Sequence, residues 1–283
     1  MKFSVFTVST PEKSPHESAR QIADYGYDGI EWRFIEEEEE TGKPGFWNGN
    51  RCTITPDMPD SKLKSLKTEV SALGLVTSNI ATYIPPSEKE KVKRALDVTA
   101  IMGASSLRLK TAAYDGTVSY QDLLKKSRED FAAACDMAAV YGIRVLAEIH
   151  HCTITPSASA AAKLAEGISS ERFGIIHDAG NMVHEGFENY QMGIEILGDY
   201  LAFVHIKNTR VVNKPCEGLQ KKEWSAEWAP LDEGAVDFSL LFRALKKSGY
   251  DGWISTEDFS EEGTQESKLK KNIEFLKKAA SAT

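Results

Sequence analysis

Four side chains that could bind a metal ion follow four successive apolar runs in the second half of the chain. They are Glu148 in VLAEIHH, Asp178 in GIIHDAGN, His205 in AFVHIKN and Glu257 in WISTEDF. Taken singly, each has a structural explanation, because a carboxylate after a strand often caps a helix and a lone histidine is more often a satisfied core residue. Three carboxylates buried together are costly unless a cation or protons neutralise them. The set therefore points to one divalent metal ion.

The donor set of three carboxylates and one imidazole is hard and rich in oxygen. Such a set suits Mn²⁺, Mg²⁺ or Co²⁺ better than a structural tetrahedral zinc ion. We expect Mn²⁺, with Mg²⁺, Co²⁺ or Zn²⁺ as alternatives.

Eight short apolar or β-branched runs alternate with helix-like segments, and several of those segments end at a glycine suited to a helix C-cap. This pattern predicts an α/β fold, a single (β/α)8 TIM barrel that spans residues 1–283 as one domain. A doubly wound open sheet is the competitor, but no GxGxxG follows the first strand and no GxxxxGK[ST] occurs. Consecutive strand ends of a parallel barrel lie side by side, so the four candidate ligands should converge at one rim. Five expected strands follow a helix end and a glycine within 23–33, 71–82, 101–111, 140–150 and 246–257, and the other three are the runs 2–8, 172–178 and 200–208.

Two long connections, 34–58 and 208–236, follow strand ends and are rich in Trp, Gly and Pro. In a barrel they would lie on the catalytic face, where they either shape a pocket or use their aromatic residues to anchor the loops. The acidic run Glu36 to Glu40 is typical of a solvated loop or helix end rather than a metal site.

The chain has a formal net charge of -8 and a sequence pI near 5.4. An acidic surface argues against nucleic acid or an anionic membrane as a partner and favours a small soluble substrate. We find neither a signal peptide nor an apolar run of membrane-spanning length. The four cysteines are far apart, which fits reduced thiols and a cytoplasmic location. Assembly into a homo-oligomer is left open.

The segments AEIHHCT, HDAGNM, FVHIKN and WAPLDEGAVDFSLLFRALKKSGYDGWISTEDF resemble the xylose isomerase-like barrel superfamily of sugar phosphate isomerases and epimerases. For its ketose epimerases the resemblance implies metal binding by Glu148, Asp178, His205 and Glu257. It also implies that Glu148 and Glu257 form the acid/base pair that flanks the substrate. Those epimerases typically carry a histidine three residues after the aspartate, where this chain has Asn181 as the candidate substrate contact.

The function that the resemblance implies is a metal-dependent sugar isomerase or epimerase that acts through an enediolate on a small ketose or related polyhydroxylated carbonyl compound. We take Glu257 as the base that removes the proton. Lys207 and His150 each lie two residues beyond a candidate ligand, so they could donate to a substrate oxygen. Arg108 or Lys110 could hold an anionic group. For these last four residues the alternative is a salt bridge that supports the carboxylates.

Other functions remain open at this stage. A metal-dependent dehydratase of the inosose or dehydroshikimate type shares the first proton abstraction, and the pairs Glu148/His150 and His205/Lys207 resemble groups used there. A noncatalytic sugar-binding barrel is a more remote alternative, since all four ligand positions carry competent side chains. The three-zinc cluster of endonuclease-IV-like relatives cannot be assembled from the six histidines.

Overall fold

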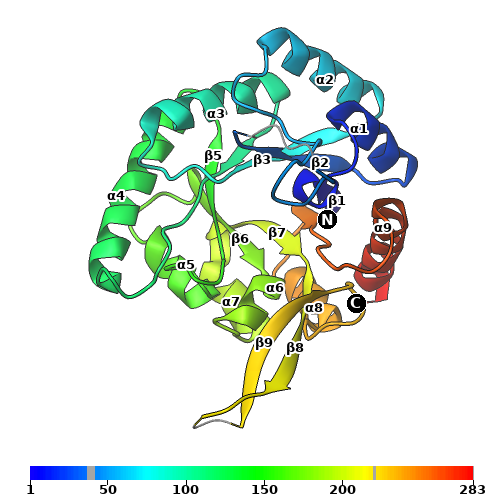
Figure 1. The fold of residues 1–283 in the computed structure, drawn as a ribbon. Coiled ribbons are helices and arrows are strands. Elements are labelled where there is room, and N and C mark those ends of the chain that lie inside the picture. The colour runs from blue at the N-terminus through cyan, green and yellow to red at the C-terminus, as the bar shows by residue number, and fades with distance from the viewer. Residues whose placement is uncertain (37–41, 219–220, 283) are drawn as a thin grey trace.

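The computed structural model describes residues 1–36, 42–218 and 221–282. Eight parallel strands form a closed barrel in the order β1-β10-β7-β6-β5-β4-β3-β2, so the predicted (β/α)8 fold is confirmed (Figure 1). Each expected strand region overlaps one strand of the barrel, and β2 extends one residue beyond its region. The strands are β1 (Lys2–Phe6), β2 (Gly29–Phe34), β3 (Val76–Thr82), β4 (Ser106–Arg108), β5 (Arg144–Glu148), β6 (Phe173–Asp178), β7 (Leu201–Ile206) and β10 (Trp253–Thr256).

Helices surround the barrel (Figure 1). Their apolar stripes face the strands, as in α8, whose residues Phe238, Leu241, Phe242 and Leu245 recur at helical spacing and are buried. The α-helices are α1 (Pro15–Asp24), α2 (Asp60–Ala72), α3 (Lys89–Met102), α4 (Tyr120–Ala139), α5 (Ala158–Ala165), α6 (Ala179–His184), α7 (Tyr190–Leu197), α8 (Phe238–Lys247) and α9 (Gln265–Ala282). Two 3-10 turns, η1 (Thr7–Ser9) and η2 (Gly198–Tyr200), also occur in the described part of the chain.

The segment GYDG occurs twice in the chain, at 26–29 and at 249–252, and each copy forms a turn from a helix to a strand. Gly26 and Gly249 follow α1 and α8 with φ of 76° and 74°, a left-handed conformation that glycine adopts without a steric penalty. Each turn leads within a few residues into a barrel strand, β2 or β10. The two strands flank β1 in the closed sheet.

The long connection 208–236 contains regular secondary structure. It contains an antiparallel hairpin of β8 (Asn208–Pro215) and β9 (Lys222–Ala229), which projects from the barrel (Figure 1). Its strands alternate in side-chain direction, so Trp224 and Trp228 share one face with their partners Asn213 and Thr209. The period of two in KEWSAEWA was the sequence signal for this hairpin.

The other long segment, 34–58, returns to the barrel where Ile54 bridges Phe34 in parallel. Residues 37–40 of the acidic run lie outside the described residues, so the interpretation of that run stays a prediction. Within the described part of the chain, no helix combines the length and the apolar character needed to cross a membrane.

Candidate metal centre

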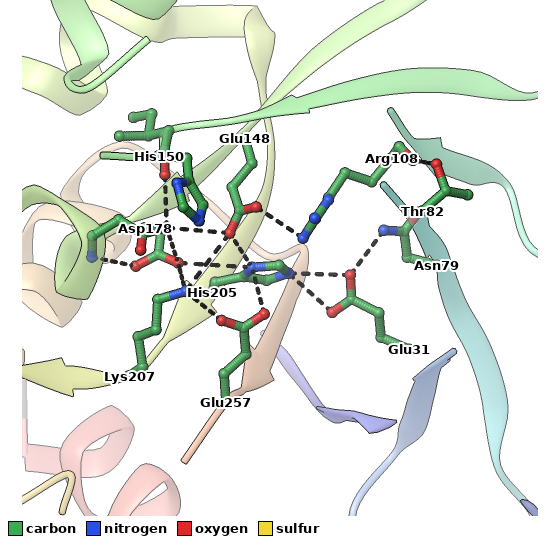
Figure 2. A network of polar contacts seen from close by, with 12 residues as sticks. Glu31, Asn79, Thr82, Arg108, Glu148, His150, Asp178, His205, Lys207 and Glu257 are labelled. Carbon is green, nitrogen blue, oxygen red and sulfur yellow. Dashed lines mark hydrogen bonds and ion pairs between the residues drawn. The ribbon is translucent and has the colours of Figure 1, made fainter. Parts of the chain in front are cut away.

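The four predicted ligands lie together at one end of the barrel (Figure 2). Glu148 and Asp178 are the last residues of β5 and β6, His205 lies in β7, and Glu257 follows β10 directly. Asp178 and His205 are register partners, which sets them side by side. One ligand atom from each of the four residues lies within 4.8 Å of the others.

The Nδ1 atom of His205 faces the three carboxylates. It lies 2.9 Å from Oε1 of Glu148, 3.2 Å from Oε1 of Glu257 and 3.8 Å from Oδ2 of Asp178. All four side chains are buried. An ion could replace a proton at the point on which these atoms converge, so the donor set and its geometry fit one divalent cation.

A fourth carboxylate, Glu31, lies on the other side of the imidazole and was missed in the sequence. Its Oε1 and Oε2 atoms are 3.1 and 3.0 Å from Nε2 of His205, and the Glu31 side chain is fully buried. Asn79, its register partner on β3, donates from Nδ2 to Oε1 over 2.9 Å. The available signal was a charged residue inside the otherwise apolar strand GIEWRF.

Two permanent cations enter the same network. Nη1 of Arg108 lies 2.8 Å from Oε2 of Glu148. Nζ of Lys207 lies 2.8 Å from Oδ2 of Asp178 and 2.5 Å from Oε2 of Glu257. Both cations are almost completely buried. The network therefore sets four buried carboxylates against two permanent cations, and a divalent ion carries the charge that would balance them.

The charges in this network shift its proton affinities. Burial opposes a charge on His205, but the neighbouring carboxylates, first Glu31 and then Glu257, outweigh burial and raise the pKa of His205 well above its usual range. Burial also disfavours an ionised Glu148, yet the Arg108 guanidinium holds the pKa of Glu148 well below its usual range. For Asp178, burial raises the pKa to about 7.

Asn181 is fully buried at the start of α6, where its side chain binds the carboxylates themselves. Its Nδ2 atom lies 3.0 Å from Oδ2 of Asp178 and 3.4 Å from Oε1 of Glu148, and its backbone N–H is capped by Oδ1 of Asp178. Oδ1 of Asn181 lies 3.2 Å from Nδ1 of His151. These contacts indicate that Asn181 orients Asp178. They fit this role better than the expected role of Asn181 in contacting the substrate.

His150 and Lys110 are the two remaining residues predicted for the site, and they differ in burial. Nδ1 of His150, which lies just beyond β5, contacts the His151 carbonyl over 2.8 Å, and burial lowers the pKa of His150 to about 4. Lys110 lies past the end of β4 with an exposed side chain. β4 ends two residues before Lys110, and the exposure of this side chain sets it apart from the buried members of the network.

Aromatic side chains from the hairpin and from the segment after β10 lie beside Lys207. Its Nζ atom lies 5.5 Å from the ring centroids of Trp228 and Phe259. Trp228 belongs to the hairpin, and Phe46, from the segment after β2, packs against Phe259 with centroids 5.3 Å apart. Both connections thus contribute an aromatic side chain to the cluster around Phe259.

A separate cavity of about 380 Å³ opens near the ends of β2 and β3. Its lining includes Phe34, Ile84, Tyr83 and Arg94, but none of the four candidate ligands. Tyr83 links the two regions, because the Arg108 guanidinium lies 5.0 Å from the Tyr83 ring centroid. The four candidate ligands therefore lie beside this cavity and do not line it.

The chain belongs to the xylose isomerase-like TIM barrel family, whose family model matches residues 19–279. The resemblance in the sequence is thereby confirmed.

Among characterised relatives, the chain is similar to L-ribulose-5-phosphate 3-epimerase UlaE of Escherichia coli (strain K12 / DH10B), with 29% identity over 177 residues. That alignment covers 61% of this chain and 56% of the enzyme, so the chain spans little more than half the length of this relative.

Solved structures show the same fold. The IolI protein with a bound zinc atom superposes with a TM-score of 0.76 at 16% identity and covers 100% of this chain and 99% of its own. D-psicose 3-epimerase in the presence of D-fructose superposes with a TM-score of 0.73 at 12% identity and covers 99% of both chains.

Proposed function

We propose that this protein is a divalent-metal-dependent sugar isomerase or epimerase that acts on a small polyhydroxylated ketose. The observation that carries the proposal is the buried network in which the carboxylates of Glu31, Glu148, Asp178 and Glu257 meet two permanent cations, Arg108 and Lys207, among the described residues, with His205 at its centre. Glu148, Asp178, His205 and Glu257 would hold the ion. Similarity to sugar epimerases supports the same reaction class. Mn²⁺ stays our expectation for the metal.

The bound ion supplies Lewis acidity that polarises a substrate carbonyl and makes the neighbouring C–H bond acidic. Glu257 removes that proton, and the substrate becomes an enediolate. The ion-pair partners of Glu257 are His205 and Lys207, whereas Glu148 is held by an arginine that keeps it ionised. Because Arg108 stabilises the ionised form of Glu148, Glu148 is the weaker base. Glu257 is therefore the better candidate for removing the proton.

Glu148, which Arg108 keeps ionised in the metal-free protein, first takes a proton from solvent and then donates it, at the opposite face of the same carbon in an epimerase or at the neighbouring carbon in an isomerase. The proton taken by Glu257 passes to solvent, so both carboxylates return to their starting states. Lys207, which contacts Glu257 and Asp178, donates a hydrogen bond to the oxygen on which negative charge develops. Asn181 holds Asp178 and Glu148 in place throughout. The aromatic side chains of Trp228 and Phe259 exclude water from Lys207.

An uncharged substrate fits this site better than a phosphorylated one. Arg108, which the sequence offered as an anion-binding residue, is committed to Glu148 over 2.8 Å, and Lys110 lies outside the network. We therefore propose a free ketose as the substrate. We also propose that residues 1–283 form one domain and that the protein is cytoplasmic. The proposal includes no choice between a monomer and a homo-oligomer.

Deuterium exchange tests the reaction class. The manganese-loaded protein is incubated in heavy water with free ketoses, ketose phosphates, inososes and dehydroshikimate, and the products are followed by NMR and mass spectrometry. We expect deuterium at the carbon beside the carbonyl of a free ketose, without loss of water. Glu257→Gln, loaded with the same metal, serves as the control that should abolish exchange.

Other outcomes assign other functions. A product lighter by one water from an inosose or dehydroshikimate would identify a dehydratase that uses the same first step. Neither exchange nor elimination at verified metal occupancy would contradict catalysis and leave a sugar-binding barrel. Exchange only with ketose phosphates would overturn the choice of an uncharged substrate.

A further inference from the structure

Glu31 is the one carboxylate of the network that the proposed metal set does not use. It reaches the centre from β2, on the opposite side of the imidazole from the three carboxylate ligands (Figure 2). Its burial is complete, and a buried carboxylate is costly unless its partners compensate it. An apolar residue would fill the same position in the barrel core at no such cost.

The two nitrogens of His205 face different groups. Nδ1 points toward the oxygens of Glu148, Glu257 and Asp178, whereas Nε2 contacts only the two oxygens of Glu31 among the described polar groups. A neutral imidazole carries one N–H and one lone pair, and a metal ligand needs the lone pair. The lone pair is on Nδ1 only when the hydrogen is on Nε2.

An ionised carboxylate accepts hydrogen bonds and donates none. Glu31 therefore favours the hydrogen on Nε2, and it increases the electron density that Nδ1 offers to a cation. We propose that Glu31 is a positioning residue that fixes the metal-binding tautomer and the ring orientation of His205. This inference rests on the proposed function, because it concerns the same metal centre.

A chain of hydrogen bonds fixes Glu31 in turn. The Ser106 hydroxyl donates to Oδ1 of Asn79 over 2.8 Å, which leaves the Asn79 amide N–H to donate to Oε1 of Glu31 over 2.9 Å. The chain runs from β4 through β3 and β2 to His205 on β7, across the interior of the barrel. All of its members are buried, so water does not compete for these bonds.

The test compares zinc binding by wild type, Glu31→Gln and Asp28→Asn. Glu31→Gln keeps the size and removes the charge, and Asp28→Asn makes the same chemical change three residues earlier, just before β2. Affinity for Zn²⁺ is measured by competition with a chromophoric chelator. We expect Glu31→Gln to bind zinc about 10- to 100-fold more weakly and Asp28→Asn to match wild type.

Nitrogen-15 NMR of histidine-labelled, zinc-loaded protein supplies a readout that a purely structural role would not move. The Nε2–H signal of His205, assigned from its absence in His205→Ala, should lie far downfield in wild type and move upfield in Glu31→Gln. Zinc affinity within about twofold of wild type together with an unmoved Nε2–H signal would overturn the inference. An equal loss of affinity in Asp28→Asn would also overturn it, since the effect would then be one of general charge.

If Glu31→Gln does not fold, Asn79→Ala tests the positioning role of Glu31 instead. It leaves the Glu31 charge in place and removes the donor that orients it, so we expect a severalfold loss of zinc affinity, and unchanged affinity would count against the inference. Wild type that binds no zinc at all would instead contradict the metal centre itself. The two failures are therefore distinguishable.

Discussion

Arg108 and Glu148 form an ion pair inside the mouth of the barrel, with Nη1 of Arg108 2.8 Å from Oε2 of Glu148 and both side chains almost fully buried. The pair gives one face of Glu148 to the arginine and leaves Oε1 facing His205. Glu148 thus has one oxygen that holds it in place and one that is available to a metal ion.

The first prediction concerns this pair. Arg108→Met should lower the free energy of unfolding of the metal-free protein by about 3–5 kcal/mol, because it leaves a buried carboxylate without its cation. Arg172→Met, which breaks the exposed pair with Asp136, should cost no more than about 1 kcal/mol. Denaturant titration with chelator present measures both. Equal losses would show that burial does not strengthen the Arg108 contact.

The second prediction concerns metal content. Purified protein should contain about one divalent ion per chain, and chelation should lower its melting temperature because the ion binds only the folded state. His205→Ala should lose the ion, while His16→Ala, which changes a partly exposed histidine on α1, should keep it. Elemental analysis decides, and stoichiometric metal in a Glu148→Ala/His205→Ala double variant would remove the proposed ligand set.

The third prediction concerns the base. Glu257→Gln keeps the shape and one ligand oxygen but cannot accept the substrate proton, so turnover should fall about 10²- to 10⁴-fold with a small change in substrate binding. Steady-state kinetics at verified metal occupancy provides the measurement. Near-normal turnover would move the base elsewhere.

The fourth prediction concerns Lys207. Lys207→Met should lower turnover at unchanged metal content if the ammonium group stabilises charge on a substrate oxygen. If Lys207 only supports Asp178 and Glu257, metal affinity should fall instead. Measuring turnover and metal affinity on the same sample separates these roles.

The fifth prediction concerns pH. His205 has a raised pKa in the metal-free protein, so its stabilising proton is fully bound below the unfolded value near 6.5 and is lost as pH rises through the folded value. The Asp178 proton, with a pKa of about 7, is lost in the same direction. Raising the pH therefore weakens the metal-free fold and reduces proton competition with the metal.

The gap in melting temperature between metal-loaded and chelator-treated protein should consequently widen from about pH 6.5 to about pH 8.5. Burial lowers the pKa values of His150, His177 and His184 to about 4, so these histidines stay neutral in the folded protein across this range. A gap that stays constant or narrows would contradict the assignment of these protons to the metal centre.

The sequence predicted the barrel because eight apolar runs alternate with helical patterns, and it predicted the four candidate ligands because each lies at or near a strand end. Glu31 escaped this argument, since it lies inside GIEWRF and its neighbours suggest an ordinary core strand. The pairing of Arg108 with Glu148 and of Lys207 with Asp178 depends on side-chain directions across the barrel. A pattern along the chain does not contain that information.

Asn208 joins the start of the β8–β9 hairpin to the chain that follows the hairpin. Asn208 donates to the Leu231 carbonyl over 2.8 Å and accepts from the Val236 backbone N–H over 3.0 Å, and a β-carbon on Gly234 would lie 2.0 Å from Oδ1 of Asn208. The part of the hairpin next to the barrel is also held by Trp228, whose ring centroid lies 4.6 Å from that of His184 and 5.4 Å from that of Phe259, whereas most residues farther along its two strands are exposed. The length and sequence of this exposed part can therefore change during evolution or in an engineered graft, while Trp228 and the strand ends that carry the carboxylates keep their places.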